Sequence, residues 1–126
     1  MIHLDTSVLI DALTGGGRSA SALRTAIDRA ERIALSTLVL YEWRRGPRSP
    51  DELRVLDALF PSALAAPFGR AEAELAAALY RRLRRPRGRE IDIAIASCAL
   101  AADAALWTLN PPDFADIPEL RLYAPS

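Results

Sequence analysis

The sequence of 126 residues contains one cysteine, one histidine and no lysine. Because Cys98 has no second cysteine to pair with, an internal disulfide framework is excluded, and its apolar surroundings favour a small buried thiol over a nucleophile. Since His3 is the only histidine, the chain lacks the histidine–cysteine clusters that bind zinc. All 16 basic residues are arginines, a usage that a GC-rich genome explains as well as any function.

Long apolar runs and a net charge are also absent. No apolar run reaches the length that crosses a membrane, and the first residues lack the basic-then-apolar pattern of a signal peptide. We therefore expect a cytoplasmic protein with no membrane partner. Acidic and basic residues balance at 16 each, so the net charge gives no general attraction to nucleic acid. The length and the 51% hydrophobic content predict a single globular domain over residues 1–126.

Short apolar segments alternate with segments of helical periodicity along the chain. Strands are predicted over residues 2–4, 33–35, 105–109 and 120–123, and helices over residues 8–13, 19–30, 38–45, 50–60, 70–85 and 90–102. Residues 63–66 fit a strand or a connection equally well. The Gly15-Gly16-Gly17 run predicts a flexible connection, because no Gly-Lys-Ser/Thr follows it as in a phosphate loop. The alternation predicts an α/β fold in which a mainly parallel sheet is covered by helices on both faces.

Two details of the predicted helices depend on single residues. Ser49 and Glu52 predict a capping box at the start of the helix over residues 50–60, and Ser36 or Thr37 predicts a cap for the helix before it. The helix over residues 90–102 is expected to bury one stripe, made of Ile91, Ile95, Cys98 and Ala102.

Four acidic residues follow strands or lie near helix starts in this layout: Asp5, Glu42, Asp92 and Asp113. Because ligands bind at the carboxyl ends of the strands in open α/β sheets, we expect these side chains to gather there. Each residue also has a structural alternative. Asp5 fits a helix cap, Glu42 an exposed helix face, Asp92 a favourable charge at a helix N-terminus, and Asp113 a turn beside two prolines.

Asp92 is the acid that the structural alternatives explain least well. It interrupts Ile91, Ile93 and Ile95 in the most apolar part of the chain, and a buried ionised carboxylate needs a partner or a cation. If several acids meet, their repulsion raises the pKa of some of them unless a metal neutralises the charge. Oxygen ligands alone suit hard cations such as Mg²⁺ or Mn²⁺.

Four motifs occur in order across the chain: LDTSVLID at residues 4–11, YEWRRG at 41–46, DIAIA at 92–96 and WTLNPPDF at 107–114. Each motif is weak alone, but together they cover almost the whole chain. With them the chain resembles PIN-domain proteins of the small VapC kind, which are the toxins of toxin–antitoxin pairs. The resemblance implies a PIN-like three-layer fold and a metal-dependent ribonuclease that leaves 5′-phosphate and 3′-hydroxyl ends.

The same resemblance implies which residues form the site. Asp5, Glu42 and Asp92 are implied as catalytic residues and as ligands of Mg²⁺ or Mn²⁺. Asp113 is the candidate for the fourth acid, catalytic and metal-binding, and Asn110 competes for that position because some relatives carry an aspartate there. Hydrogen-bonding members of the site are implied at Thr6, Ser7, Thr108 and Asn110.

RNA is the implied substrate. We expect the arginine-rich segment over residues 81–89 to contact the RNA backbone, above all through Arg87 and Arg89, because arginine binds phosphate well and these two directly precede Asp92. The alternative is a solvated helix end, where cations are favourable. The family often has an arginine where this chain has Leu109, which is a departure from the pattern.

A small antitoxin protein is the implied partner, and we also expect a homodimer. Tyr41 and Trp43 flank Glu42 beside Leu38 and Leu40, which predicts an apolar groove that binds the antitoxin. The alternative is that both aromatic residues belong to the core.

Two other functions stay open from the sequence. One is a protein-interaction module with a non-catalytic acidic site, which the intact Asp5, Glu42 and Asp92 argue against. The other is a metal-dependent phosphatase with Asp5 as its nucleophile. Phosphatases of the haloacid dehalogenase type usually carry a second aspartate two residues later, where this chain has Ser7.

Overall fold

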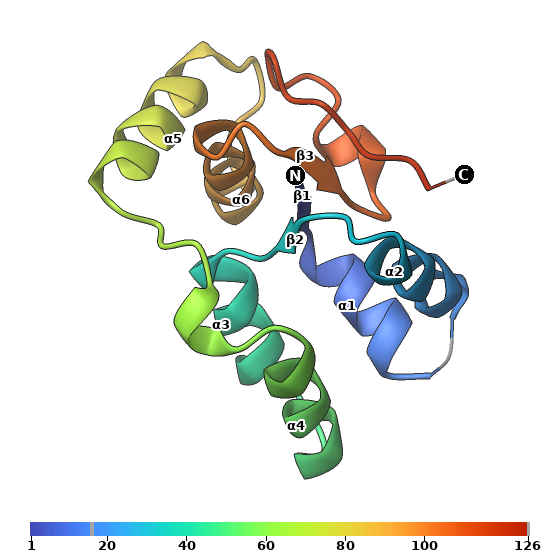
Figure 1. Ribbon diagram of the computed structural model, residues 1–126. Helices are drawn as coiled ribbons and strands as arrows, with labels where there is room; N and C mark the ends of the chain where they lie inside the picture. The colour runs from blue at the N-terminus through green and yellow to red at the C-terminus, as the bar shows by residue number, and fades with distance from the viewer. Residues whose placement is uncertain (16, 126) are drawn as a thin grey trace.

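Short strands are separated by groups of helices along the chain in the computed structural model, which describes residues 1–15 and 17–125 (Figure 1). The elements in order are β1 (Ile2–Leu4), α1 (Thr6–Leu13), α2 (Arg18–Asp28), β2 (Ile33–Ala34), α3 (Thr37–Arg45), α4 (Pro50–Leu59), α5 (Arg70–Arg82), α6 (Glu90–Ala101) and β3 (Ala105–Trp107), with 3-10 turns η1 (Ser62–Leu64) and η2 (Pro111–Asp113). Of the predicted glycine connection, Gly16 lies outside the described residues.

The sheet has three parallel strands in the order β2-β1-β3. Ile2 stands opposite Ile33 on one side and Ala105 on the other. The predicted strand over residues 120–123 is wrong, because Leu122 forms only an isolated bridge to Leu106. Prolines at positions 118 and 125 flank that segment, and a proline has no N–H to donate to a sheet.

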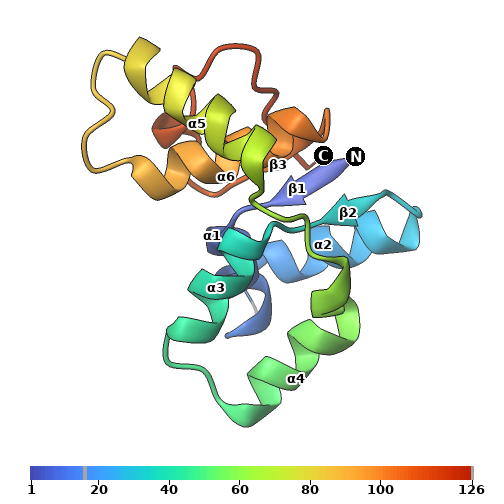
Figure 2. The same ribbon diagram turned by 90° about the vertical axis from the view of Figure 1, so that its left-hand side faces the viewer.

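Helices cover both faces of the sheet, as the sequence predicts. Figure 2 shows α5 and α6 on one face and α1 with α2 on the other, while α3 and α4 form a hairpin that reaches away from the strands. The α/β fold with a parallel sheet between helical layers is therefore confirmed. Within residues 1–15 and 17–125, no helix is both long and apolar enough to cross a membrane.

Local capping explains where two helices begin. The Ser36 hydroxyl accepts a hydrogen bond from the Val39 amide at 3.3 Å, at the start of α3. At α4, the Ser49 hydroxyl accepts from the Glu52 amide at 3.1 Å, and the Glu52 carboxylate accepts from the Ser49 amide at 2.8 Å. The predicted caps are confirmed. The Ser36 cap begins α3 close to the edge of the sheet.

Helix α6 is enclosed on nearly all sides over its middle turns. Every residue from Ile93 to Ala99 is buried, whereas Ile91 and Ala102 are exposed. The predicted single stripe is therefore wrong at Ile91 and Ala102, because α3, α5 and β3 all pack against α6. Asp92 lies in the first turn of the helix, where the chain enters this core.

The undecided segment over residues 63–66 is a connection. It contains η1, and only Ala66 approaches the sheet region, through an isolated bridge to Ser36. The predicted strand over residues 105–109 ends earlier, at Trp107. Thr108 and Leu109 therefore lie beyond the strand, at the same edge of the sheet as Asp5.

Candidate active site

Asp5 follows the central strand and is 6% exposed. It occupies the N-cap position of α1, yet its side chain makes no capping bond, so the capping alternative does not hold. Instead, Asp5 Oδ2 accepts hydrogen bonds from Thr108 Oγ1 at 2.7 Å and Ser7 Oγ at 2.9 Å. The pairing of Leu4 with Trp107 explains the first contact, because it places the two strand ends side by side.

Glu42 is joined to the same edge by a hydroxyl group from α1. Thr6 Oγ1 donates to Glu42 Oε1 at 2.6 Å. The second carboxylate oxygen, Oε2, lies 3.7 Å from Nη2 of Arg45, one turn further along α3. Glu42 is therefore held toward the end of β1 and is not an ordinary exposed residue of a helix face.

The segment after β3 is bound to the turn after β1. Ser7 Oγ accepts a hydrogen bond from the Leu109 amide at 3.0 Å, and Thr108 Oγ1 accepts one from the Asn110 amide at 3.0 Å. These bonds link Ser7, Thr108 and Asn110 to one another around Asp5. All four residues implied as hydrogen-bonding members thus lie at one edge of the sheet.

Asp92 lies close enough to the other acids to be affected by their charge. Burial, and then the charges of Asp5, Asp113 and Glu42, raise its pKa to about 6, against a smaller opposing effect of Arg89. The side chains therefore share one region of negative potential. Among the described residues, however, no three acidic, histidine or cysteine side chains lie in an arrangement that could hold a metal ion by themselves.

An open depression of about 540 Å³ holds these groups together. Its walls include Asp5, Glu42 and Asp92, together with Thr6, Ser7 and Asn110. We call this depression the acid pocket. Carboxylate and amide oxygens form its donor set, which suits a hard divalent cation, and such a cation would offset the repulsion that raises the pKa of Asp92.

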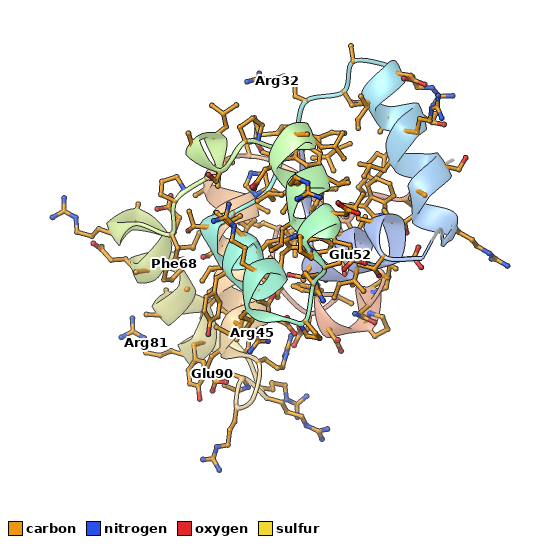
Figure 3. All side chains as sticks on the ribbon, turned by 90° about the horizontal axis from the view of Figure 1, so that it is seen from below. Arg32, Arg45, Glu52, Phe68, Arg81 and Glu90 are labelled. Atoms are coloured by element: carbon orange, nitrogen blue, oxygen red, sulfur yellow. The ribbon has the colours of Figure 1, made fainter. Side chains whose placement is uncertain are left out.

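Two arginines in the same walls were not singled out from the sequence. Arg45 ends α3, and Arg48 lies in the connection to α4. Figure 3 looks at the molecule from the side of this hairpin and labels Arg45. Their sequence signal was their position: Arg45 lies three residues after Glu42 in the same motif, and Arg48 lies two residues beyond the end of that motif.

Asp113 and the two predicted RNA-binding arginines lie outside the walls of the acid pocket. Asp113 is exposed in η2, and its negative charge helps to raise the pKa of Asp92. Arg89 forms a bidentate pair with Asp116, at 2.6 and 2.9 Å, and donates to the Asp113 carbonyl at 2.9 Å. Arg89 thus ties the start of α6 to η2, whereas Arg87 is exposed. The RNA contact of both arginines stays a prediction.

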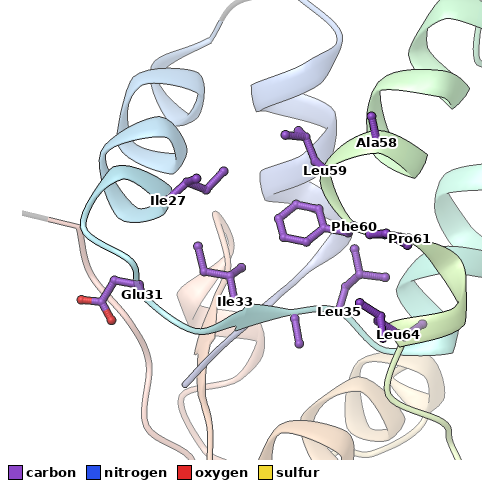
Figure 4. A pocket seen from close by; sticks show the side chains of 11 residues that line it. Ile27, Glu31, Ile33, Leu35, Ala58, Leu59, Phe60, Pro61 and Leu64 are labelled. Carbon is purple, nitrogen blue, oxygen red and sulfur yellow. The ribbon is translucent and has the colours of Figure 1, made fainter.

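The predicted apolar groove around Glu42 is wrong in one part. Trp43 is fully buried in the core, whereas Tyr41 is 59% exposed. An apolar pocket of about 340 Å³ lies elsewhere, between the end of α2, β2 and the end of α4 (Figure 4). Ile27, Leu59 and Leu64 line it and are exposed.

Comparisons with known proteins place the chain in a family. The model of the PIN domain matches residues 2–120. Ribonuclease VapC19 from Mycobacterium tuberculosis (strain CDC 1551 / Oshkosh) is 34% identical over 120 residues, which cover 94% of this chain and 95% of that protein. The crystal structure of VapBC2 from Rickettsia felis, bound to a DNA fragment from its promoter, contains a chain that is 25% identical, with a TM-score of 0.76 and 98% of both chains covered.

A second solved structure agrees in fold. The DNA-bound VapBC from Salmonella typhimurium contains a chain with a TM-score of 0.80 at 22% identity, covering 97% of this chain and 96% of that one. The family match extends over nearly all of the chain, and the motifs around Asp5, Glu42 and Asp92 fall inside it. This protein therefore belongs to the PIN domain family.

Proposed function

We propose that the chain is a metal-dependent endoribonuclease that hydrolyses RNA phosphodiester bonds, and that it is the toxin of a toxin–antitoxin pair. The observation that carries the proposal is the acid pocket, in which Asp5, Glu42 and Asp92 line one open depression. The relative named Ribonuclease VapC19 supports the reaction, and the VapBC structures support an antitoxin partner.

Asp5, Glu42 and Asp92 are proposed to hold Mg²⁺ or Mn²⁺, with Asn110 or Asp113 in the fourth position. A divalent cation supplies charge neutralisation at the phosphate and lowers the pKa of a water molecule. The hydroxyls of Ser7 and Thr108 hold Asp5 through Oδ2. Asp5 Oδ1 accepts no hydrogen bond from the described residues, and we propose it as the oxygen that would contact the cation.

The hydroxyl groups orient carboxylates in this proposal. Thr6 holds Glu42 through Oε1, and Ser7 and Thr108 hold Asp5, so both acids enter the reaction without first losing side-chain freedom. The openness of the acid pocket suits a polymer, because a strand can cross it without threading through an opening. Products with 5′-phosphate and 3′-hydroxyl ends, which the resemblance to the family implies, would form when water attacks phosphorus and the 3′ oxygen leaves.

The phosphatase alternative gains no support from the site. Ser7 stands where a second aspartate would be needed, and its hydroxyl is occupied by Asp5 and the Leu109 amide.

We further propose that residues 1–126 act as one domain in the cytoplasm, that the protein forms a homodimer, and that a small antitoxin inhibits it.

Cleavage of RNA by the purified protein tests the proposal. Single-stranded or looped RNA should be cut in the presence of Mg²⁺ or Mn²⁺, and cutting should stop when a chelator is added. A simple phosphate ester is the matched control substrate and should not be hydrolysed. Turnover of the ester without RNA cleavage would instead identify a phosphatase.

A further inference from the structure

We propose that Arg48 forms a phosphate subsite at the rim of the acid pocket, and that it binds an RNA phosphate next to the one that is cut. The inference rests on the proposed function, because it assigns how the same pocket holds its substrate. Neither the motifs nor the carboxylates account for this residue.

The Arg48 side chain is held by its surroundings before any ligand arrives. Its guanidinium carbon lies 4.5 Å from the centroid of the Trp43 ring, and Nη1 donates to the Pro47 carbonyl at 2.8 Å. Trp43 is fully buried, so the ring is a fixed platform. Gly46 lies directly beside the guanidinium, since a Cβ there would come within 3.0 Å of both Nη atoms. A guanidinium stacked in this way loses little freedom when it binds an anion.

Arg48 also lacks a counter-charge. Arg44 pairs with Asp57 at 3.0 Å and Arg45 lies 3.7 Å from Glu42, but Arg48 pairs with no carboxylate in residues 1–15 and 17–125. Its Nε atom is buried and has no hydrogen-bond partner among these residues. A half-buried cation without a paired carboxylate is stabilised by an anionic ligand at its accessible nitrogen atoms, whereas the buried Nε atom is out of reach of such a ligand.

Phosphate is the anion that this position favours. A planar guanidinium binds phosphate oxygens through two parallel hydrogen bonds. Arg48 lines the same depression as Asp5 and Asp92, and the volume of about 540 Å³ lies in the range of nucleotide-sized sites. A strand that places one phosphate at the acids therefore carries a neighbouring phosphate past the rim.

Kinetics and binding of matched variants test the subsite. Arg48→Gln removes the charge and leaves a shorter polar side chain, and Arg44→Gln, which makes the same change, is the control because Arg44 pairs with Asp57, outside the acid pocket. We expect Arg48→Gln to raise KM for a short RNA about tenfold with little change in kcat. This pattern follows when an interaction is lost that the substrate and the transition state make equally. Arg48→Lys should recover part of the loss, and Arg44→Gln should match the wild type.

The position of the contact is found by replacing single phosphates of the RNA with neutral methylphosphonates. The wild type should lose affinity at one phosphate beside the cut, and Arg48→Gln should be insensitive to replacement at that same phosphate. Equal sensitivity of both proteins at every phosphate would overturn the subsite. So would an unchanged RNA affinity combined with weaker binding of a co-expressed antitoxin, which would assign Arg48 to a protein carboxylate.

Direct RNA binding separates this inference from the proposed reaction. If the wild type cuts RNA and Arg48→Gln binds it equally well, the subsite is wrong and the nuclease stands. If the wild type binds RNA through Arg48 but does not cut it, the proposed reaction is wrong, whereas the binding of an RNA phosphate by Arg48 stands. A fall in RNA affinity that only parallels a fall in melting temperature would also count against the subsite.

Discussion

Thr6 Oγ1 donates a 2.6 Å hydrogen bond to Glu42 Oε1 across a sequence separation of 36 residues. This bond joins the first turn of α1 to the middle of α3, so it sets the orientation of one carboxylate relative to Asp5. We expect Thr6→Val to lower the cleavage rate about tenfold and the free energy of unfolding by about 1 kcal/mol. Valine keeps the branched shape, and Thr6→Ser, which keeps the hydroxyl, is the control. Equal cleavage by the valine and serine variants would show that the bond does not orient Glu42.

Asp5→Asn should abolish cleavage while the protein stays folded. An amide oxygen can still accept the bonds from Ser7 and Thr108, but the residue loses the charge that a hard cation requires. Without metal, its melting temperature should equal or exceed that of the wild type, because one repelling charge is gone. Mg²⁺ should raise the melting temperature of the wild type but not of the variant. A folded Asp5→Asn protein with full activity would end the nuclease proposal.

The pKa of Asp92 predicts how stability varies with pH in the absence of metal. Because its pKa is raised to about 6 from 3.8, the folded state binds more protons than the unfolded state between these values. The free energy of unfolding should therefore fall as pH rises from 4 to 7, by about 1 kcal/mol from this group after allowance for solvent screening.

His3 affects the pH dependence of the free energy of unfolding in the opposite direction to Asp92. Burial, and then the charge of the N-terminus, lower its pKa from 6.5, so its contribution to stability falls as pH decreases below that value. The difference between the urea unfolding curves of the wild type and Asp92→Asn isolates the Asp92 share. Parallel pH profiles for the two proteins would contradict the shift, and Mg²⁺ at pH 7 should remove most of the difference.

Arg87 and Arg89 should differ when each is replaced by alanine. Arg87 is exposed, so Arg87→Ala should leave the melting temperature unchanged and reduce the salt slope of RNA binding by about one. Arg89→Ala should also lower the free energy of unfolding by about 1 kcal/mol, because it breaks the bidentate pair that holds the pKa of Asp116 below its usual value. Asp116→Asn is the control for stability alone. An unchanged salt slope in both arginine variants would refute their contact with RNA.

Local patterns in the sequence predict the order of the strands and helices from β1 to β3 and the starts of α3 and α4. Those features depend on apolar periodicity and on capping bonds between residues a few positions apart. A single segment of the sequence contains both signals. The motifs around Asp5, Glu42 and Asp92 also named a family that the comparisons bear out. The segment over residues 120–123 was mistaken for a strand because its local pattern resembles one, whereas it hydrogen-bonds to β3 at Leu106 alone, between the prolines at positions 118 and 125.

Which side chains meet depends on how the strands and helices pack in three dimensions. A periodic pattern tells which face of a helix is apolar, but not how many neighbouring elements cover that face. The exposure of Ile91 and the burial of Trp43 could therefore not be predicted from the pattern. The bond between Asp5 and Thr108 joins residues 103 positions apart, and it exists because β1 and β3 pair in parallel. The stacking of Arg48 on Trp43 likewise depends on the path of the chain between α3 and α4, since no periodic pattern specifies the contacts of a connection.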